Sequence, residues 1–160
     1  MLSFIKSSEP TQFREIYRRP IDREGGNNDK TPPIIEGSEI DRGNEFIGQG
    51  IFGRVYIALY DGKRYAWKEY KKPTFEKAKH EAECLKLMNH PNIVKVFGLC
   101  QNPVSILMQL CEGENLDKLI KKKDFNPPLR ILLVWTLQVA EGLWHMHNRE
   151  IPVCHGDIKP

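Results

Sequence analysis

The sequence has few cysteines and no long apolar run. Its four cysteines, among 160 residues, show no Cys-x-x-Cys spacing, which argues against a zinc site or a redox motif. No apolar run approaches the roughly 20 residues of a membrane-spanning helix. No secretory signal pattern follows Met1. We therefore expect a reducing compartment, the cytoplasm or the nucleus.

Neither sign of charge dominates the sequence. It has 24 lysine and arginine residues against 21 aspartate and glutamate residues, a net charge of +3. That balance is too even to indicate nucleic-acid binding. The basic run Lys121–Lys123 is interpreted as a solvated helix end, where cations are favoured, in preference to a recognition patch. A hydrophobic content of 40% fits a globular protein with a core.

Residues 1–43 lack any persistent helical or strand period. They mix charges with prolines and with the polar run Gly25–Asp29. This composition predicts a flexible leader, one that could dock a partner, ahead of a domain over residues 44–160.

The domain opens with three β-rich segments, residues 44–49, 54–60 and 63–70. Asp61-Gly62 joins the last two as a hairpin turn, since both residues tolerate positive φ. Residues 74–89, with Thr74 as N-cap, then switch to helical spacing, and two further strands follow over 93–100 and 104–111. The apolar stripe of this helix consists of Ala78, Ala82, Leu85 and Met88. The pattern predicts an α+β fold: a five-stranded antiparallel sheet with one helix packed on it.

Two further helices are predicted after the sheet, over residues 115–123 and 127–147. Asn126 is a plausible N-cap of the second. That helix is apolar nearly all round, so it needs burial on most sides. The short remainder after His147 cannot supply this cover. We therefore expect the native chain to continue, and a large apolar patch around Trp135 and Leu143.

Three glycines follow a Gly-x-Gly-x-x-Gly pattern at Gly48, Gly50 and Gly53. Without side chains, their backbone N–H groups can approach phosphate oxygens closely. An ordinary glycine-rich hairpin is the plain alternative. A dinucleotide-binding fingerprint is excluded by context, because that motif opens a helix and here the glycines are followed by Val55 in a strand.

Lys68 and Glu81 are the two candidate charged residues of the core. Lys68 shares a strand face with Ala66, and a phosphate or a carboxylate would explain a lysine there. Glu81 lies on the apolar stripe of the predicted helix, where a carboxylate is rarely left unpaired. We predict a Lys68–Glu81 ion pair. The alternatives are a solvent-facing lysine and a glutamate at the edge of the stripe.

The last motif runs from Cys154 to Pro160. Asp157 in it can accept a proton from a substrate hydroxyl, and Lys159 can steady a transferring phosphate. Alone, this stretch is equally consistent with a polar surface turn.

In their order and spacing, these motifs resemble the protein kinase family over about residues 46–160. The resemblance implies that Lys68 contacts the α- and β-phosphates of ATP while paired to Glu81. Asp157 would be the catalytic base and Lys159 the lysine of the catalytic loop, as in serine/threonine kinases. Met108 would stand at the back of the nucleotide pocket, beside the hinge. The implied nucleotide contacts are Gly48, Gln49, Gly50, Gly53, Val55, Ala66, Lys68, Met108, Gln109, Leu110 and Cys111.

Two features depart from the family pattern. The usual His-Arg-Asp reads His155-Gly156-Asp157, which is similar to some tyrosine-kinase-like and interleukin-receptor-associated (Pelle-like) kinases. The catalytic-loop asparagine and the Asp-Phe-Gly aspartate, which bind Mg²⁺ in the family, would lie beyond Pro160.

The resemblance implies a serine/threonine kinase that transfers phosphate from ATP to a protein hydroxyl. Residues 44–111 would form the amino-terminal lobe and hinge, and residues 112–160 the start of a helical lobe. We expect this partial chain to be inactive by itself. The alternative is a non-catalytic truncated kinase or pseudokinase that acts as a binding module. Nothing in the sequence indicates the protein substrate.

Overall fold

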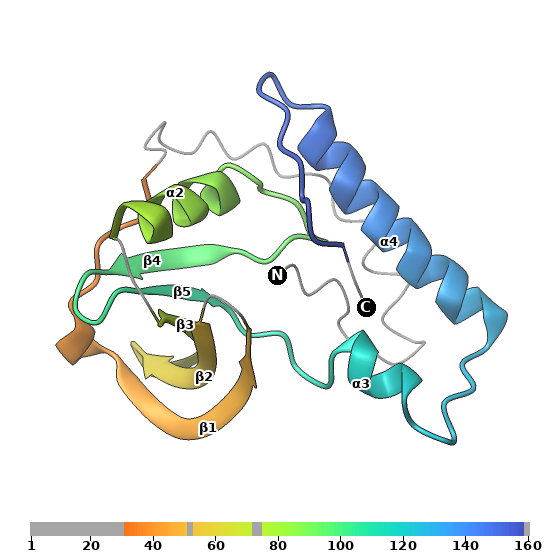
Figure 1. Cartoon of the computed structure of the whole chain (residues 1–160), viewed down its shortest axis with the longest axis horizontal. Coiled ribbons are helices and arrows are strands. Elements are labelled where there is room, and N and C mark those ends of the chain that lie inside the picture. The colour runs from red at the N-terminus through yellow and green to blue at the C-terminus, as the bar shows by residue number, and fades with distance from the viewer. Residues whose placement is uncertain (1–30, 51–52, 72–74, 159–160) are drawn as a thin grey trace.

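The structure, a computed structural model, describes residues 31–50, 53–71 and 75–158. A curled antiparallel sheet carries helix α2 on one face, and two further helices follow the sheet (Figure 1). The strands are β1 (Asp41–Gln49), β2 (Gly53–Tyr60), β3 (Lys63–Tyr70), β4 (Val96–Cys100) and β5 (Ser105–Gln109). The helices are α2 (Phe75–Lys86), α3 (Leu116–Ile120) and α4 (Leu129–His147).

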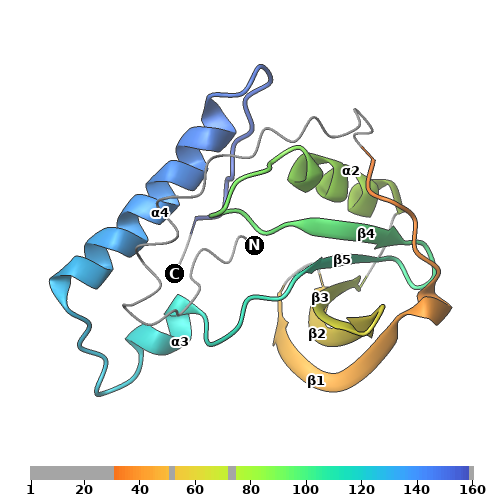
Figure 2. The same ribbon diagram turned by 180° about the vertical axis from the view of Figure 1, so that it is seen from behind.

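The five strands are ordered β1-β2-β3-β5-β4, and every neighbouring pair is antiparallel. Asp61 and Gly62 form the β2–β3 turn with φ of 48° and 69°, which confirms the predicted hairpin. Pairing of β1 with β2 is irregular between Arg42 and Gly48, where β1 bends round the sheet (Figures 1 and 2). The predicted α+β class with five antiparallel strands is confirmed.

Alternation along β3 divides the core into two layers. Trp67 packs on one face of the sheet with Ile35, Ile40 and Leu107. Residues 66, 68 and 70 point to the other face, which α2 covers. There Ala78 and Ala82 of α2 are fully buried against Leu99 and Ile106, as the predicted stripe requires. The Lys68 side chain is thereby directed at a helix rather than at open solvent.

Residues 32–40 pack against the sheet and residues 41–43 begin β1, whereas the sequence predicts a flexible leader over residues 1–43. Ile34 pairs with Leu99 as a parallel bridge, and the N–H groups of Ile35 and Leu99 donate to Leu99 O and Pro33 O, both at 2.9 Å. Ile35 and Ile40 are buried. Residues 32–40, including the turn η2 (Gly37–Glu39), form what we call the edge segment. Its apolar residues are too few to show a period, and its partner strand lies more than 60 residues away.

Some element boundaries also differ from the predictions. The expected N-cap Thr74 lies outside the described residues. The N-cap position of α4 is Pro128, not Asn126, and it makes no side-chain capping hydrogen bond. Pro127 precedes a proline and is therefore disfavoured in the helical conformation that an N-cap at Asn126 would require of it. Helix α3 is shorter than predicted, and Asn115 caps it by accepting a hydrogen bond from the Lys118 N–H at 2.9 Å.

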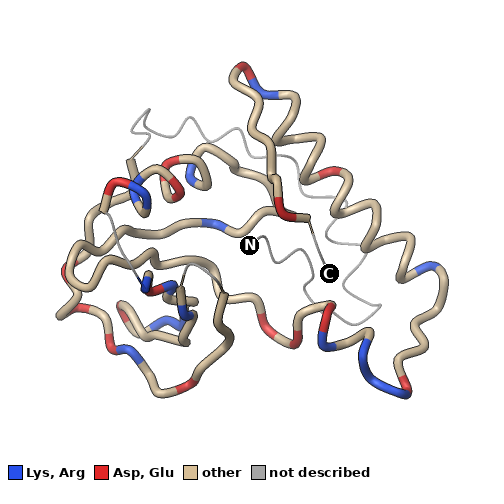
Figure 3. Tube along the Cα trace, viewed as in Figure 1, with Lys and Arg blue, Asp and Glu red and all other residues tan. Residues whose placement is uncertain are grey.

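Helix α4 presents the apolar surface that its sequence predicts. Leu129 and Trp144 are 70% and 67% exposed, and Leu133 and Leu137 lie exposed between them. Trp135 and Leu143, the predicted centre of the patch, are instead half-buried. Figure 3 shows α4 almost free of charge after the basic turn that precedes it. No helix within the described ranges combines the length and apolarity needed to cross a membrane.

A pair of histidines joins the sheet side of the molecule to α4. His90 follows α2, and its ring stacks on that of His145 in α4 with centroids 5.0 Å apart. Beside them, Asn92 donates to Glu141 at 3.0 Å. Burial lowers the pKa of His90, assisted by the charge of His145, while Glu141 opposes it. Burial and then the charge of Arg149 lower the pKa of His145.

The histidine pair predicts a loss of stability in mild acid. Because both folded-state pKa values lie below the usual 6.5, the unfolded chain takes up protons first as pH falls through 6.5. The free energy of unfolding is therefore unaffected by the pair above this pH and decreases below it. Urea denaturation between pH 7.5 and pH 5 measures the slope. The variant His90→Gln/His145→Gln should flatten it, whereas His80→Gln, at an exposed site outside the pair, should not. An unchanged slope in the double variant would contradict the prediction.

Candidate nucleotide site

The glycine-rich hairpin connects β1 to β2 at one end of the sheet. Gly50 N–H donates to Gly53 O at 2.9 Å, and Gly48 pairs with Val55. A Cβ on Gly53 would lie 2.3 Å from Glu69 O, so the close approach of β2 to β3 requires glycine there. A Cβ on Gly48 would meet nothing within 4 Å. The absent side chain at Gly48 therefore leaves open space, which a phosphate chain would need.

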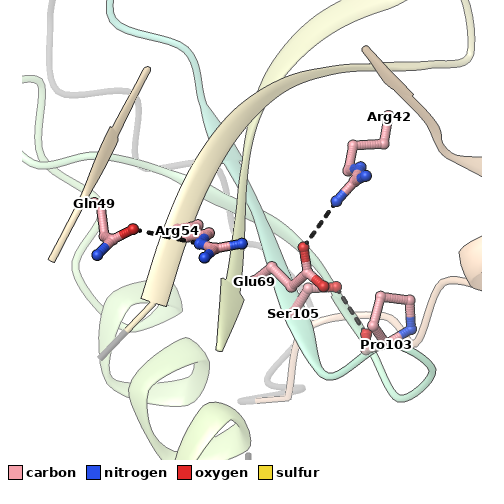
Figure 4. A network of polar contacts seen from close by, with 6 residues as sticks. All are labelled: Arg42, Gln49, Arg54, Glu69, Pro103 and Ser105. Atoms are coloured by element: carbon pink, nitrogen blue, oxygen red, sulfur yellow. Dashed lines mark hydrogen bonds and ion pairs between the residues drawn. The ribbon is translucent and has the colours of Figure 1, made fainter. Parts of the chain in front are cut away.

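The Gln49 side chain is held by the hairpin itself. Its Oε1 accepts a hydrogen bond from Arg54 Nε at 3.3 Å, across the turn between the two strands (Figure 4). On the same sheet, Arg42 pairs with Glu69 at 3.1 Å. The hydrogen bond thus directs the Gln49 side chain across the hairpin toward Arg54.

Lys68 and Glu81 form the predicted ion pair. Lys68 Nζ donates to Glu81 Oε1 at 2.6 Å and to Oε2 at 2.8 Å. The lysine side chain is 14% exposed and the glutamate side chain 33%. Burial alone would raise the pKa of Glu81, but the charge and hydrogen bonds of Lys68, with a hydrogen bond from Tyr70, hold it below the usual value. The carboxylate is thus ionised at neutral pH and fixes the amine.

Backbone register brings the other predicted contacts together around Lys68. Val55 in β2 is opposite Lys68, and Ala66 in β3 is opposite Met108 in β5. Ala66 is buried, while Val55 and Met108 are half-buried. These side chains and the lysine come from three adjacent strands, which is the arrangement a flat apolar ring beside a phosphate chain requires.

The predicted hinge follows the end of β5. Gln109 N–H donates to Lys95 O at 2.8 Å, so this N–H is already engaged within the protein. Leu110 and Cys111 come next and are half-buried. Glu112 then pairs with Arg64 at 3.3 Å, which ties the connection back to β3. The Gln109 N–H therefore cannot donate to adenine while it donates to Lys95 O.

The predicted catalytic loop lies after α4, without regular secondary structure. Asp157 N–H donates to His155 Nδ1 at 3.1 Å, and the Asp157 side chain is exposed. The loop is anchored upstream, where Val153 N–H donates to Met146 O at 3.1 Å. Lys159 lies outside the described residues.

Metal-ligating side chains are not clustered in the described part of the chain. Across residues 31–50, 53–71 and 75–158, no three histidine, cysteine, aspartate or glutamate side chains come close enough to bind a metal. Hard cations such as Mg²⁺ take oxygen ligands. In the family, such ligands are the catalytic-loop asparagine and the Asp-Phe-Gly aspartate, which are predicted beyond Pro160.

Two neighbours of the site, Tyr70 and Lys71, were not predicted from the sequence. Tyr70 OH donates to Glu81 Oε2 at 2.6 Å, and Lys71 Nζ reaches Gly50 O at 3.4 Å. Strand alternation could have found Tyr70, since it stands two positions beyond Lys68 and faces the same helix. Lys71 follows the end of β3, and no period predicts the direction of its side chain.

A hollow over β1 and β2, near Gly43 and Arg64, is lined by none of the predicted nucleotide contacts.

A curled sheet, a glycine hairpin at its end and a strand lysine paired to a helix glutamate define the nucleotide-binding lobe of a phosphotransferase. The chain belongs to the protein kinase domain family, whose sequence profile matches residues 42–160. Members of this family use ATP and Mg²⁺.

Several curated relatives are MAP kinase kinase kinases. The chain is 37% identical over 126 residues to MAP kinase kinase kinase SSK2 of Saccharomyces cerevisiae, an alignment covering 72% of this chain and 8% of that protein. It is 34% identical to human mitogen-activated protein kinase kinase kinase 10, over 72% of this chain and 13% of that protein. Another relative, 37% identical over 72% of this chain and 9% of its own length, is named serine/threonine-protein kinase SSK22 of S. cerevisiae. The chain thus spans about a tenth of the length of these relatives.

Proposed function

We propose that the protein containing this chain transfers the γ-phosphoryl group of ATP to a serine or threonine hydroxyl of another protein. The observation that carries the proposal is the Lys68–Glu81 ion pair, at 2.6 Å, on the face of β3 below α2. An ammonium held by a carboxylate is a fixed point charge for phosphate oxygens. Family membership and the relatives' names support the reaction class.

Each site residue has a role under this proposal. Lys68 binds the α- and β-phosphates, and the backbone of Gly48, Gly50 and Gly53 lies over the phosphate chain. Val55, Ala66 and Met108 enclose the adenine. Gln49 and the hinge residues Leu110 and Cys111 contribute backbone groups, with Gln109 contributing its carbonyl and side chain. Asp157 accepts the proton of the substrate hydroxyl, and Lys159 steadies the transferring phosphate. Bound Mg²⁺ would neutralise phosphate charge.

The relatives' names indicate a substrate class. The three relatives described are two MAP kinase kinase kinases and one serine/threonine-protein kinase. We propose a MAP kinase kinase as the protein substrate. We also propose that the protein containing this chain acts in the cytoplasm or nucleus. Residues 1–30 are the proposed docking segment for a partner, since residues 32–43 are taken up by the sheet.

Thermal unfolding of the chain with and without nucleotide tests the binding site. A ligand at 100 times its Kd stabilises the folded state by about 2.7 kcal/mol. We expect ATP to raise Tm by several degrees and adenosine to raise it less, because adenosine lacks the phosphates that Lys68 would bind. Equal effects of the two would contradict the phosphate role, and no effect of ATP would contradict the site.

Phosphorylation of a MAP kinase kinase by the full gene product tests the transfer step. We expect this activity to be lost in the variant Asp157→Asn.

A non-catalytic binding module is the second candidate function. It is favoured by Gly156, which stands where the family usually has an arginine. Under this alternative, ATP would stabilise the chain while the full gene product transferred no phosphate. Transfer that depends on Asp157 would exclude it.

A further inference from the structure

Tyr70 completes a closed cluster with the ion pair. It is the last residue of β3, two positions beyond Lys68 on the same strand face. Its hydroxyl donates to Glu81 Oε2 at 2.6 Å, and Lys68 Nζ lies 4.8 Å from the centroid of its ring. Each of the three side chains therefore contacts the other two.

The three side chains share Glu81 unequally. Glu81 Oε1 accepts from Lys68 at 2.6 Å, whereas Oε2 accepts from both Lys68, at 2.8 Å, and Tyr70. A lysine has four rotatable bonds and a tyrosine has two, so the tyrosine is the stiffer anchor. Its hydroxyl fixes the oxygen that the flexible lysine reaches at the longer distance.

Tyr70 remains a hydrogen-bond donor at any physiological pH. Burial, followed by the negative charge of Glu81, raises the pKa of its hydroxyl far above the usual value. A hydrogen bond to a charged acceptor is worth more than one between neutral groups. The hydrogen bond from Tyr70 to Glu81 consequently joins the end of β3 to the middle of α2. Near neutral pH the hydroxyl stays protonated and the carboxylate stays ionised, so the bond keeps its strength.

We propose that Tyr70 is a positioning residue, which holds the Glu81 carboxylate against Lys68 so that the ion pair is already formed before nucleotide binds. Its effect on nucleotide binding rests on the proposed function; its effect on Glu81 does not. In this role Tyr70 acts through the carboxylate and touches no nucleotide.

The variant Tyr70→Phe removes the hydroxyl and keeps the ring. We expect ATP affinity, measured by calorimetry, to fall about three- to tenfold, because Glu81 then holds Lys68 less firmly. In a Lys68→Met background, Tyr70→Phe should cause no further loss. Tyr65→Phe is the matched control, because Tyr65 lies on the opposite face of the same strand and packs on Phe97. An equal loss in the control, or a further loss without Lys68, would overturn the proposal.

A second measurement needs no nucleotide. The Glu81 carboxyl can be titrated by ¹³C NMR, and we expect Tyr70→Phe to raise its pKa relative to the original chain and to Tyr65→Phe. An unchanged Glu81 pKa would overturn the positioning role even if ATP affinity fell. Conversely, if ATP failed to bind the original chain but the pKa rose as expected, the proposed nucleotide site would fail and the positioning role would stand.

Discussion

Replacing Lys68 with methionine is expected to lower ATP affinity at least about tenfold, a loss of roughly 1.4 kcal/mol. The physical reason is that the amine is the cation held by Glu81, with both carboxylate oxygens within 2.8 Å of Nζ. Methionine has similar length and no charge, so it removes the phosphate contact with little change in volume. Calorimetry with ATP measures the change. Lys63→Met, at the exposed start of the same strand, is the control and should bind ATP as the original chain does.

Lys68→Met should also destabilise the protein. Adding Glu81→Gln should restore the stability but not the ATP affinity. Without Lys68, the half-buried Glu81 carboxylate loses its counter-charge, which costs about 1–3 kcal/mol. In Lys68→Met/Glu81→Gln neither charge remains, and the new amide can still accept the Tyr70 hydroxyl. Urea denaturation should therefore show stability restored to within about 1 kcal/mol, while ATP affinity stays low. If the double variant regained ATP binding, Lys68 would not be the phosphate contact.

How much of this site could be read from sequence depends on the range of each interaction. The glycine hairpin and the Asp61-Gly62 turn are local, and their residues dictate the backbone that the structure shows. The Lys68–Glu81 pair spans 13 residues, yet two periodicities, of strand and helix, place both side chains on facing surfaces. The same alternation places Tyr70 on the face of Lys68. Packing of its ring is enough to account for a tyrosine on that face, so the sequence does not single out its hydroxyl.

Other features depend on contacts that no period records. Gln109 N–H is engaged by Lys95, a residue just before β4, so its availability depends on how two strands are paired. Helix α4 begins at Leu129, two residues later than the apolar pattern predicts, because Pro127 precedes another proline and is disfavoured in the helical conformation. The nucleotide contacts of Val55, Ala66 and Met108, and the roles of Asp157 and Lys159, remain predictions that the binding experiments test.

Replacing Ile35 with alanine is expected to reduce the free energy of unfolding by about 2–4 kcal/mol, as for other buried isoleucines. Ile35 is 4% exposed and packs with Trp67 and Leu107, although it precedes β1 in a proline-rich stretch. Ile34→Ala is the control one position away; Ile34 is 60% exposed, so its loss should cost no more than about 0.5 kcal/mol. An effect of Ile35→Ala as small as that of Ile34→Ala would show that the edge segment lies free of the domain.

The contact between Ile35 and Gly98 allows a sharper form of the same test. A Cβ on Gly98 would lie 2.0 Å from Ile35 Cδ1 and 2.6 Å from its Cγ1, so Gly98→Ala should cost about 1–3 kcal/mol by overpacking. Ile35→Ala removes both of those atoms, and the methyl group at residue 98 then occupies part of the space they leave. The double variant should therefore be more stable than the sum of the single effects predicts, by about 1–2 kcal/mol in urea denaturation. Strict additivity would place Ile35 away from β4. A coupling of this size requires that Ile35, from the residues before β1, packs directly against β4.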